Sequence, residues 1–312
     1  MDESSRSTIP VPVALFVYRR HELLPRTLRC LRDSGVDALY VFSDGPADAS
    51  AQADVGRVRE LIAAIDWIAP SVSASERNLG LSASIRAGLD TVFASHPRAI
   101  VIEDDVCVAP EFCAYAKAAL ETYEREPQVA GITGLRYPFS RRALRGYRFD
   151  AFMSPRFCSW SWATWGDRWE RFEFDHEVLR RRLRARAGLR LTRAGADMPW
   201  MIRAAIEDES MGGSWDVDCA ASMLLDDQYF VTPTWNMVEN SGLSEGTHDT
   251  GRPPAWKLAW EPEYRPDLGA LRLPPVAEDE RVLRAYRRFF ALGPRRAVMA
   301  ALPRLRSAAE RR

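Results

Sequence analysis

Three adjacent carboxylates, Glu103-Asp104-Asp105, directly follow an apolar run at residues 99–102. Adjacent carboxylates repel one another, so they destabilise a fold unless a cation or another positive partner lies among them. Their oxygens are hard ligands that suit Mn²⁺ or Mg²⁺, and these ions also bind substrate phosphates. We therefore predict that this segment holds a divalent ion and a diphosphate. The alternative is a solvated acidic turn.

Two further polar clusters also follow apolar runs. Tyr18-Arg19-Arg20 comes after residues 11–17, and Asp44-Gly45 comes after residues 38–43. The carboxyl ends of parallel strands meet at one edge of a sheet, where ligands bind in open α/β folds. We therefore expect all three clusters to lie around one ligand.

Apolar runs and helical patterns alternate in the first part of the chain. The runs predict strands at residues 11–18, 38–43, 72–75 and 99–102, and helices at 23–35, 53–66 and 81–95. Alternation of this kind predicts an α/β fold with a mostly parallel central sheet. Beyond residue 130 the chain becomes aromatic and irregular, with helical patterns at 177–195, 200–207 and 215–225 and a strand at 229–233.

These patterns divide the chain into four parts. We expect a disordered N-terminus at 1–10 and a catalytic domain at 11–255, with halves at 11–130 and 131–255. A proline-rich linker at 256–277 and a basic helical tail at 278–312 follow. The tail predicts basic amphipathic helices, which either lie peripherally on an anionic membrane or pack on the domain.

Composition narrows the functional classes. The net charge is zero, which argues against nucleic acid as a partner. The five cysteines are odd in number and form no CxxC pair, which argues against a disulfide framework or a zinc site. Because no apolar run is long enough to span a membrane, we expect a cytoplasmic protein, either soluble or peripheral on the inner face of the membrane. The chain also lacks GxxxxGK and GxGxxG, the common phosphate-binding loops.

The stretch at residues 100–115, IVIEDDVCVAPEFCAY, resembles the metal-binding segment of GT-A glycosyltransferases. It is most similar to the N-acetylglucosaminyltransferase I type and its bacterial glycosyltransferase family 2-like relatives, and the resemblance extends over residues 11–249. It implies a GT-A (Rossmann-like) nucleotide-diphospho-sugar transferase fold, a divalent ion, a nucleotide-sugar donor and inversion at the anomeric carbon.

The resemblance also implies roles for individual residues. Asp105 corresponds to the metal ligand, with Glu103 and Asp104 contacting sugar and ribose. Asp44 corresponds to a base-contacting aspartate that is compatible with uracil. The other residues on the nucleotide-sugar side are Tyr18, Arg20 (or Arg19 in its place), Asn78 and Gly80.

A late histidine often returns to the metal in this superfamily. His248 lies in a segment rich in glycine and small polar residues, so it is either a second metal ligand or an exposed loop residue.

Inversion requires a carboxylate that takes the proton of the acceptor hydroxyl. In Ser214-Trp215-Asp216-Val217-Asp218, the resemblance favours Asp216 as this base, with Asp218 as a rival. On a helix the two point to opposite sides, so only one can face the site. Either could instead be the N-cap of the following helix.

Trp160 and Trp162 lie in a tryptophan-rich stretch. Their rings could form a platform for the acceptor sugar, or they could belong to the core.

Together these observations predict an inverting glycosyltransferase. It would move a sugar from a nucleotide-diphosphate donor, favoured as a UDP-sugar, to a glycan or lipid-linked acceptor. The alternatives are a GT-A-like domain that binds a nucleotide sugar or glycan without turnover, and a nucleotidyltransferase or kinase on a similar sheet.

Overall fold

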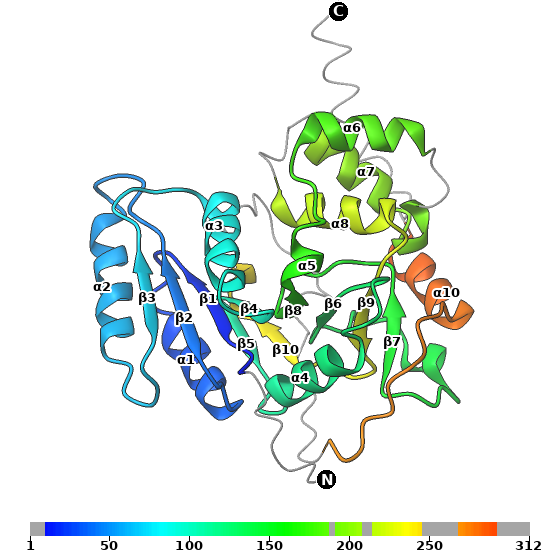
Figure 1. Ribbon diagram of the computed structural model, residues 1–312, viewed down its shortest axis with the longest axis horizontal. Helices are drawn as coiled ribbons and strands as arrows, with labels where there is room; N and C mark the ends of the chain where they lie inside the picture. The colour runs from blue at the N-terminus through cyan, green and yellow to red at the C-terminus, as the bar shows by residue number, and fades with distance from the viewer. Residues whose placement is uncertain (1–9, 187–190, 208–213, 245–267, 292–312) are drawn as a thin grey trace, which may run out of the picture.

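The computed structural model describes residues 10–186, 191–207, 214–244 and 268–291. A mixed sheet in the order β3-β2-β1-β4-β8-β6-β9-β7 runs through the molecule (Figure 1). The strands are β1 Val13–Val17, β2 Leu39–Ser43, β3 Ser71–Ala74, β4 Arg98–Glu103, β6 Val129–Thr133, β7 Ala151–Ser154, β8 Trp162–Trp165 and β9 Tyr229–Pro233. A separate antiparallel pair joins β5 (Val106–Val108) to β10 (Val238–Asn240).

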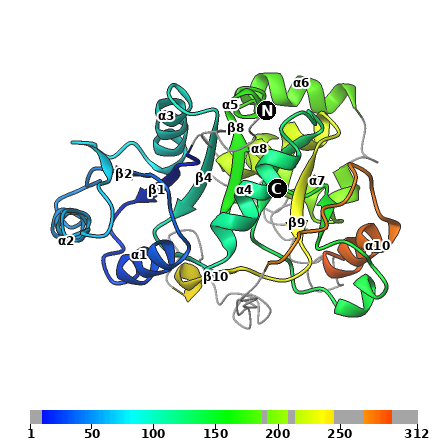
Figure 2. The same cartoon turned by 60° about the horizontal axis from the view of Figure 1, so that its bottom comes forward.

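Helices cover both faces of this sheet (Figures 1 and 2). Alternate residues of β1 explain its unbroken apolar run: Val13 and Leu15 enter one core cluster, and Ala14 and Phe16 enter the other. The first cluster includes side chains of α1, α2 and α4, and the second includes those of α3, α6, α7 and α8. The helices are α1 Leu24–Asp33, α2 Gln52–Ala63, α3 Leu81–Phe93, α4 Phe112–Thr122, α5 Gly166–Trp169, α6 His176–Ala185, α7 Met198–Ile202, α8 Trp215–Leu225 and α10 Glu280–Phe289.

The predicted α/β class with a mostly parallel central sheet is confirmed. β3, β2, β1 and β4 pair in parallel, as do β6 and β9, and three pairings involving β8 or β7 are antiparallel. The predicted strands and helices of the first hundred residues lie within a few residues of their observed bounds, and α8 and β9 also lie where predicted.

The sequence pattern did not predict strands β5, β6, β7, β8 and β10. Of these, β8 joins the two halves of the sheet. It inserts antiparallel between β4 and β6, with Trp162 opposite Val101 on one side and Thr133 on the other. The sheet therefore continues directly from the first half of the chain into the second.

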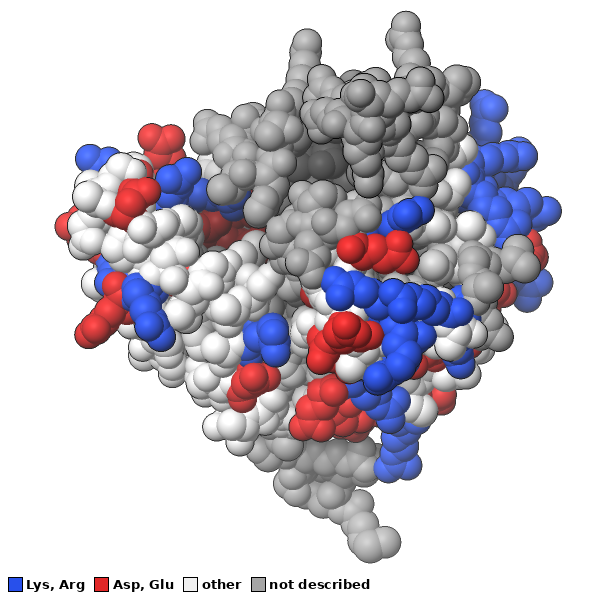
Figure 3. Space-filling model, turned by 90° about the horizontal axis from the view of Figure 1, so that it is seen from above, with Lys and Arg blue, Asp and Glu red and all other residues white. Residues whose placement is uncertain are grey.

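The described part of the C-terminal tail packs on the domain. Helix α10 buries Val282, Leu283 and Tyr286, and a buried cluster surrounds Tyr286 with Phe139 and Phe152. Its arginines 284, 287 and 288 are exposed, and basic side chains gather at this edge of the molecule (Figure 3). The apolar face of this helix is thus covered by protein. Of the two alternatives for the tail, this part of it packs on the domain and does not present its apolar face to a membrane. The rest of the tail lies outside the described residues.

Two cysteines are paired. Cys30 in α1 and Cys107 in β5 form a disulfide, with their Cα atoms 5.6 Å apart. The cysteine count argued against a disulfide framework, and this prediction is wrong for Cys30 and Cys107. Pairing depends on the distance between two cysteines in the fold, and an odd total does not prevent it. Cys113, Cys158 and Cys219 are free and buried. Disulfides are typical of oxidising compartments, so the cysteines no longer favour a cytoplasmic location.

Among the described residues, no helix has both the length and the apolar character needed to cross a bilayer.

Candidate functional site

The polar clusters that follow β1 and β4 come together at the carboxyl edge of the sheet. The two strands are parallel neighbours, with Phe16 opposite Glu103, so the residues after each strand emerge side by side. Acidic side chains lie in a recess at this edge, beside the lobe that carries α2 (Figure 3). The structure therefore brings together Tyr18, Arg20 and the three carboxylates, as expected.

Arg20 supplies the positive charge among these carboxylates. Its Nη1 lies 3.1 Å from Oδ1 of Asp104 and 2.6 Å from Oδ2 of Asp105. Burial disfavours the charged guanidinium, but the attraction of Asp105 and Asp104 outweighs burial and raises the pKa of Arg20. The guanidinium thus offsets part of the repulsion that the sequence implied.

The carboxylates nevertheless bind protons more tightly than usual. Burial raises the pKa of Asp104 to about 6, although Arg20 opposes this shift. Burial also raises the pKa of Asp105, and burial together with the charges of Asp105 and Asp104 raises the pKa of Glu103 well above its ordinary value. One guanidinium is therefore not enough to balance the site, which favours a further cation there.

Asp104 and Asp105 point to different surroundings. Oδ2 of Asp104 accepts a hydrogen bond of 3.0 Å from the backbone N–H of Tyr18, so this carboxylate is tied to the end of β1. Oδ1 of Asp105 is buried and has no hydrogen-bond partner among the described residues. A buried carboxylate oxygen without a partner is costly, and a metal ion is one partner that would satisfy it.

A turn after β10 also lies against Asp105. The backbone N–H of Ser241 donates to the carbonyl of Asp105 at 2.8 Å. At Gly242, an added Cβ would lie 2.1 Å from Oδ2 of Asp105, so only glycine allows this approach. The carboxylate of Asp105 is therefore confined by both Arg20 and Gly242.

The residues present are compatible with a divalent ion held partly by substrate. No group of three or more His, Cys, Asp or Glu side chains in the described part of the chain is arranged to hold a metal alone. Mg²⁺ is commonly bound by only one or two carboxylates plus substrate phosphates, and the unpartnered oxygen of Asp105 fits that pattern. His248, the expected second ligand, lies outside the described residues.

Asp44 and the turn at Asn78-Leu79-Gly80 form a second hydrogen-bonded unit. Oδ1 of Asp44 accepts from the N–H of Leu79 at 2.8 Å, and Oδ2 accepts from Asn78 Nδ2 at 3.1 Å and from the N–H of Gly80 at 3.0 Å. Gly80 has a φ of +79°, a conformation that favours glycine. The structure therefore gives Asp44 a role in holding this turn. Its expected contact with a base remains a prediction.

Asp216 and Asp218 lie in the first turn of α8 with different neighbours. Ser214 is the N-cap residue, so neither aspartate occupies that position. Asp216 is half-buried, accepts hydrogen bonds from the Ser214 hydroxyl and from the N–H of Val217, and lies near enough to Glu103 to contribute to its raised pKa. Of the two rivals, Asp216 is thus electrostatically linked to the acidic run.

Asp218 is buried and faces another partner. Its Oδ1 lies 3.2 Å from Nε2 of His176, the first residue of α6. Burial raises the pKa of Asp218 to about 6, while His176 opposes the shift. The two residues lie 42 positions apart in the sequence, so only the packing of α6 against α8 brings their side chains together.

The expected acceptor tryptophans lie in or against the core. Trp162 is fully buried, and its ring contacts Phe157, Trp215 and Phe230. It therefore has no free face for a sugar, which corrects the prediction for this residue. Trp160 is half-buried and packs against the other core cluster.

Comparisons with known proteins give only a distant structural likeness. No protein-family model matches the chain, and no curated protein matches its sequence. Among solved structures, one match is a mannosyltransferase from Pyrobaculum calidifontis in complex with GDP-Man and Mn²⁺ (TM-score 0.40, 14% identity, 70% of each chain covered). Another is GalNAc-T7 with UDP, GalNAc and Mn²⁺ (TM-score 0.45, 10% identity, 73% of this chain). The match spans 43% of that second protein. Likenesses of this size assign no function, which must be inferred from the site itself.

Proposed function

We propose that this protein is a metal-dependent glycosyltransferase of the GT-A type, which transfers a sugar from a nucleotide-diphosphate donor with inversion. The observation that carries the proposal is the buried, unpartnered Oδ1 of Asp105 within a run of carboxylates whose pKa values are all raised. Such a site has excess negative charge. A divalent cation bridging to a diphosphate would neutralise it.

In this proposal Asp105 holds Mn²⁺ or Mg²⁺, and His248 is a second candidate ligand. The ion, when bound, neutralises charge that develops on the diphosphate leaving group. Arg20 already bridges Asp104 and Asp105, and a guanidinium at this position is suited to phosphate oxygens. Glu103 and Asp104 would contact the sugar and ribose, as the sequence resemblance implies.

The remaining donor-side residues would position the nucleotide. Asp44 fixes the turn at residues 78–80, which lies after β3 at the same edge of the sheet as the acidic run. Tyr18 is tied to Asp104 by its backbone N–H. We favour a UDP-sugar as the donor and a glycan or lipid-linked molecule as the acceptor.

Asp216 is the proposed general base. It is close to Glu103 and half-exposed at the start of α8, so it could accept the proton of an acceptor hydroxyl as the new glycosidic bond forms. Asp218 is directed to His176, which leaves Asp216 as the aspartate available to the site. Asp218 would then be a structural partner of α6.

Donor turnover tests this function. The purified protein would be incubated with UDP-sugars and GDP-sugars in Mn²⁺ or in excess EDTA, and released nucleoside diphosphate would be measured. We expect slow metal-dependent hydrolysis of at least one donor, which is faster when an acceptor is present. Metal-dependent binding without release would instead indicate a non-catalytic nucleotide-sugar-binding domain.

A further inference from the structure

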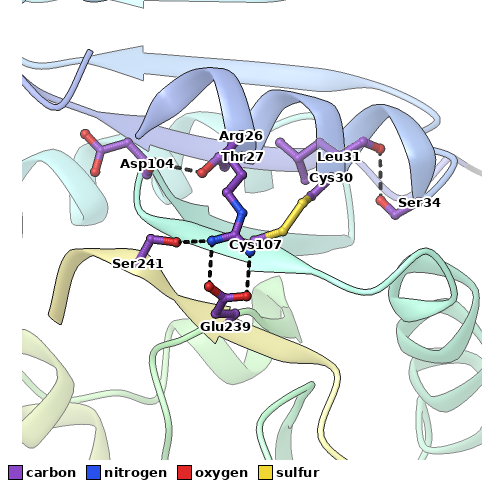
Figure 4. Close-up of a disulfide and its surroundings, with 9 residues drawn as sticks. All are labelled: Arg26, Thr27, Cys30, Leu31, Ser34, Asp104, Cys107, Glu239 and Ser241. Atoms are coloured by element: carbon purple, nitrogen blue, oxygen red, sulfur yellow. Dashed lines mark hydrogen bonds and ion pairs between the residues drawn. A yellow bond between two sulfur atoms is a disulfide. The ribbon is translucent and has the colours of Figure 1, made fainter. Parts of the chain in front are cut away.

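The two chain segments that carry the opposite charges of the site are covalently joined. Arg20 lies just before α1, and Asp105 lies just before β5. Cys30 in α1 and Cys107 in β5 form the disulfide, across 77 residues of sequence (Figure 4). The bond therefore lies two residues beyond Asp105 and ties its strand to the helix that follows Arg20.

The same side of α1 makes two further contacts with this region. The buried hydroxyl of Thr27 donates to the backbone carbonyl of Asp104 at 2.8 Å. Arg26 donates to both carboxylate oxygens of Glu239 at 2.5 and 2.6 Å, and to the Ser241 hydroxyl at 2.8 Å (Figure 4). One helical turn of α1 thus reaches the acidic run, β5 and β10.

These contacts converge on the backbone around Asp105. Glu239 is paired with Cys107 in the β5–β10 ribbon. The chain continues from β10 into Ser241 and Gly242, which lie against Asp105. The ribbon has only three residues in each strand. The Arg26 and Glu239 side chains are 45% and 28% exposed, and exposed ion pairs typically contribute only about 0–1 kcal/mol. The disulfide is therefore the strongest link between α1 and this ribbon.

We propose that the Cys30–Cys107 disulfide is a positioning element for the cation and donor site, and that reducing it weakens binding there. This inference rests on the proposed function. A dithiol would break the S–S bond, leave two thiols on the chain and become a disulfide itself. Cys30 is half-buried and Cys107 is buried.

The binding test compares oxidised and reduced protein. Titration calorimetry would measure Mn²⁺ and UDP binding before and after dithiothreitol treatment, with the reductant removed first because dithiols bind metal. Losing a partner that orients a metal ligand typically weakens metal binding about 10–100-fold, and we expect a loss of this size. The double variant C30S/C107S should bind as weakly as the reduced protein and should not respond to dithiothreitol. Equal affinity in both redox states, or an equal dithiothreitol effect on the double variant, would overturn the proposal.

Hydrogen exchange provides a readout that needs no ligand. Reduction should speed amide exchange at Ser241 and Ala109, whose N–H groups bond to Asp105 and Met237, and should leave α8 unchanged. If the oxidised protein bound neither Mn²⁺ nor UDP, the proposed function would fail, and this local loosening would show only that the disulfide holds the Asp105 segment and the β5–β10 ribbon in place. Unchanged exchange at both amides, or equal acceleration throughout the chain, would refute it.

Discussion

Nη1 of Arg20 lies 2.6 Å from Oδ2 of Asp105, so the guanidinium forms a direct ion pair with the proposed metal ligand. Replacing Arg20 by Gln should leave two buried carboxylates without their partner. We expect the free energy of unfolding to fall by about 1–3 kcal/mol, because unpaired buried charges are costly. Mn²⁺ should restore part of this loss by supplying another positive charge.

Urea unfolding with and without Mn²⁺ would measure both effects. Arg19→Gln is the matched control, since Arg19 is exposed and its guanidinium lies over the Tyr18 ring, 6.0 Å from the centroid. Surface substitutions usually change stability by less than about 0.5 kcal/mol. Equal stability of the two variants would contradict the role given to Arg20.

The assignment of the base predicts different behaviour for two nearby aspartates. Asp216→Asn should lower kcat by about 10²–10⁴-fold and leave donor affinity nearly unchanged, because a general base acts only in the chemical step. Asp218→Asn should lower kcat much less. Steady-state kinetics and donor titration of both variants would check this, and a larger kcat loss in Asp218→Asn would reverse the assignment.

Asp218 also predicts a pH dependence of stability. Burial raises its pKa from 3.8 to about 6, so the folded protein binds this proton more tightly than the unfolded chain does. Between pH 4 and pH 6 the folded state therefore holds more protons at this site, and its contribution makes the free energy of unfolding fall as pH rises.

Replacing Asp218 by Asn should remove this contribution. Between pH 4 and pH 6, the contribution of this site to the fall in the free energy of unfolding, about 1–3 kcal/mol in wild type, should then be absent. Urea unfolding at several pH values would measure the difference. Parallel profiles for the two proteins would show that Asp218 has an ordinary pKa in the folded state.

Gly242 predicts a steric effect on the site. In Gly242→Ala, the new methyl group would overlap Oδ2 of Asp105 and displace either the carboxylate or the turn. We expect weaker Mn²⁺-dependent donor binding and a destabilisation of about 1–3 kcal/mol. Gly56→Ala is the control, because nothing lies within 4 Å of that position and alanine is favoured inside α2. Unchanged donor affinity in Gly242→Ala would show that the site does not depend on this close approach.

The first half of the fold follows from local pattern. Runs such as residues 13–17 are buried on both faces, which is typical of parallel strands, and polar residues at their carboxyl ends must then meet. For this reason the clusters that contain Arg20 and the acidic run could be placed at one edge of the sheet from the sequence, whereas the ion pairs of Arg20 with Asp104 and Asp105 were not predicted.

The second half depends on pairings that the sequence does not display. Trp162–Trp165 is a four-residue strand in a tryptophan-rich stretch, and its place in the middle of the sheet is decided by β4 and β6. The bond between Cys30 and Cys107 and the pair His176–Asp218 likewise join residues that are far apart in sequence. Only packing brings such groups within reach.

Titration calorimetry of nucleotide-diphosphate sugars tests the central claim most directly. Wild-type protein and Asp105→Asn would each be titrated with UDP-sugars and GDP-sugars, in Mn²⁺ and in EDTA. We expect at least one donor to bind wild-type protein only when Mn²⁺ is present, and we expect Asp105→Asn to lose this binding while remaining folded. Equal donor affinity in Mn²⁺ and EDTA, or undiminished Mn²⁺-dependent binding by Asp105→Asn, would contradict a metal-bridged donor site at Asp105.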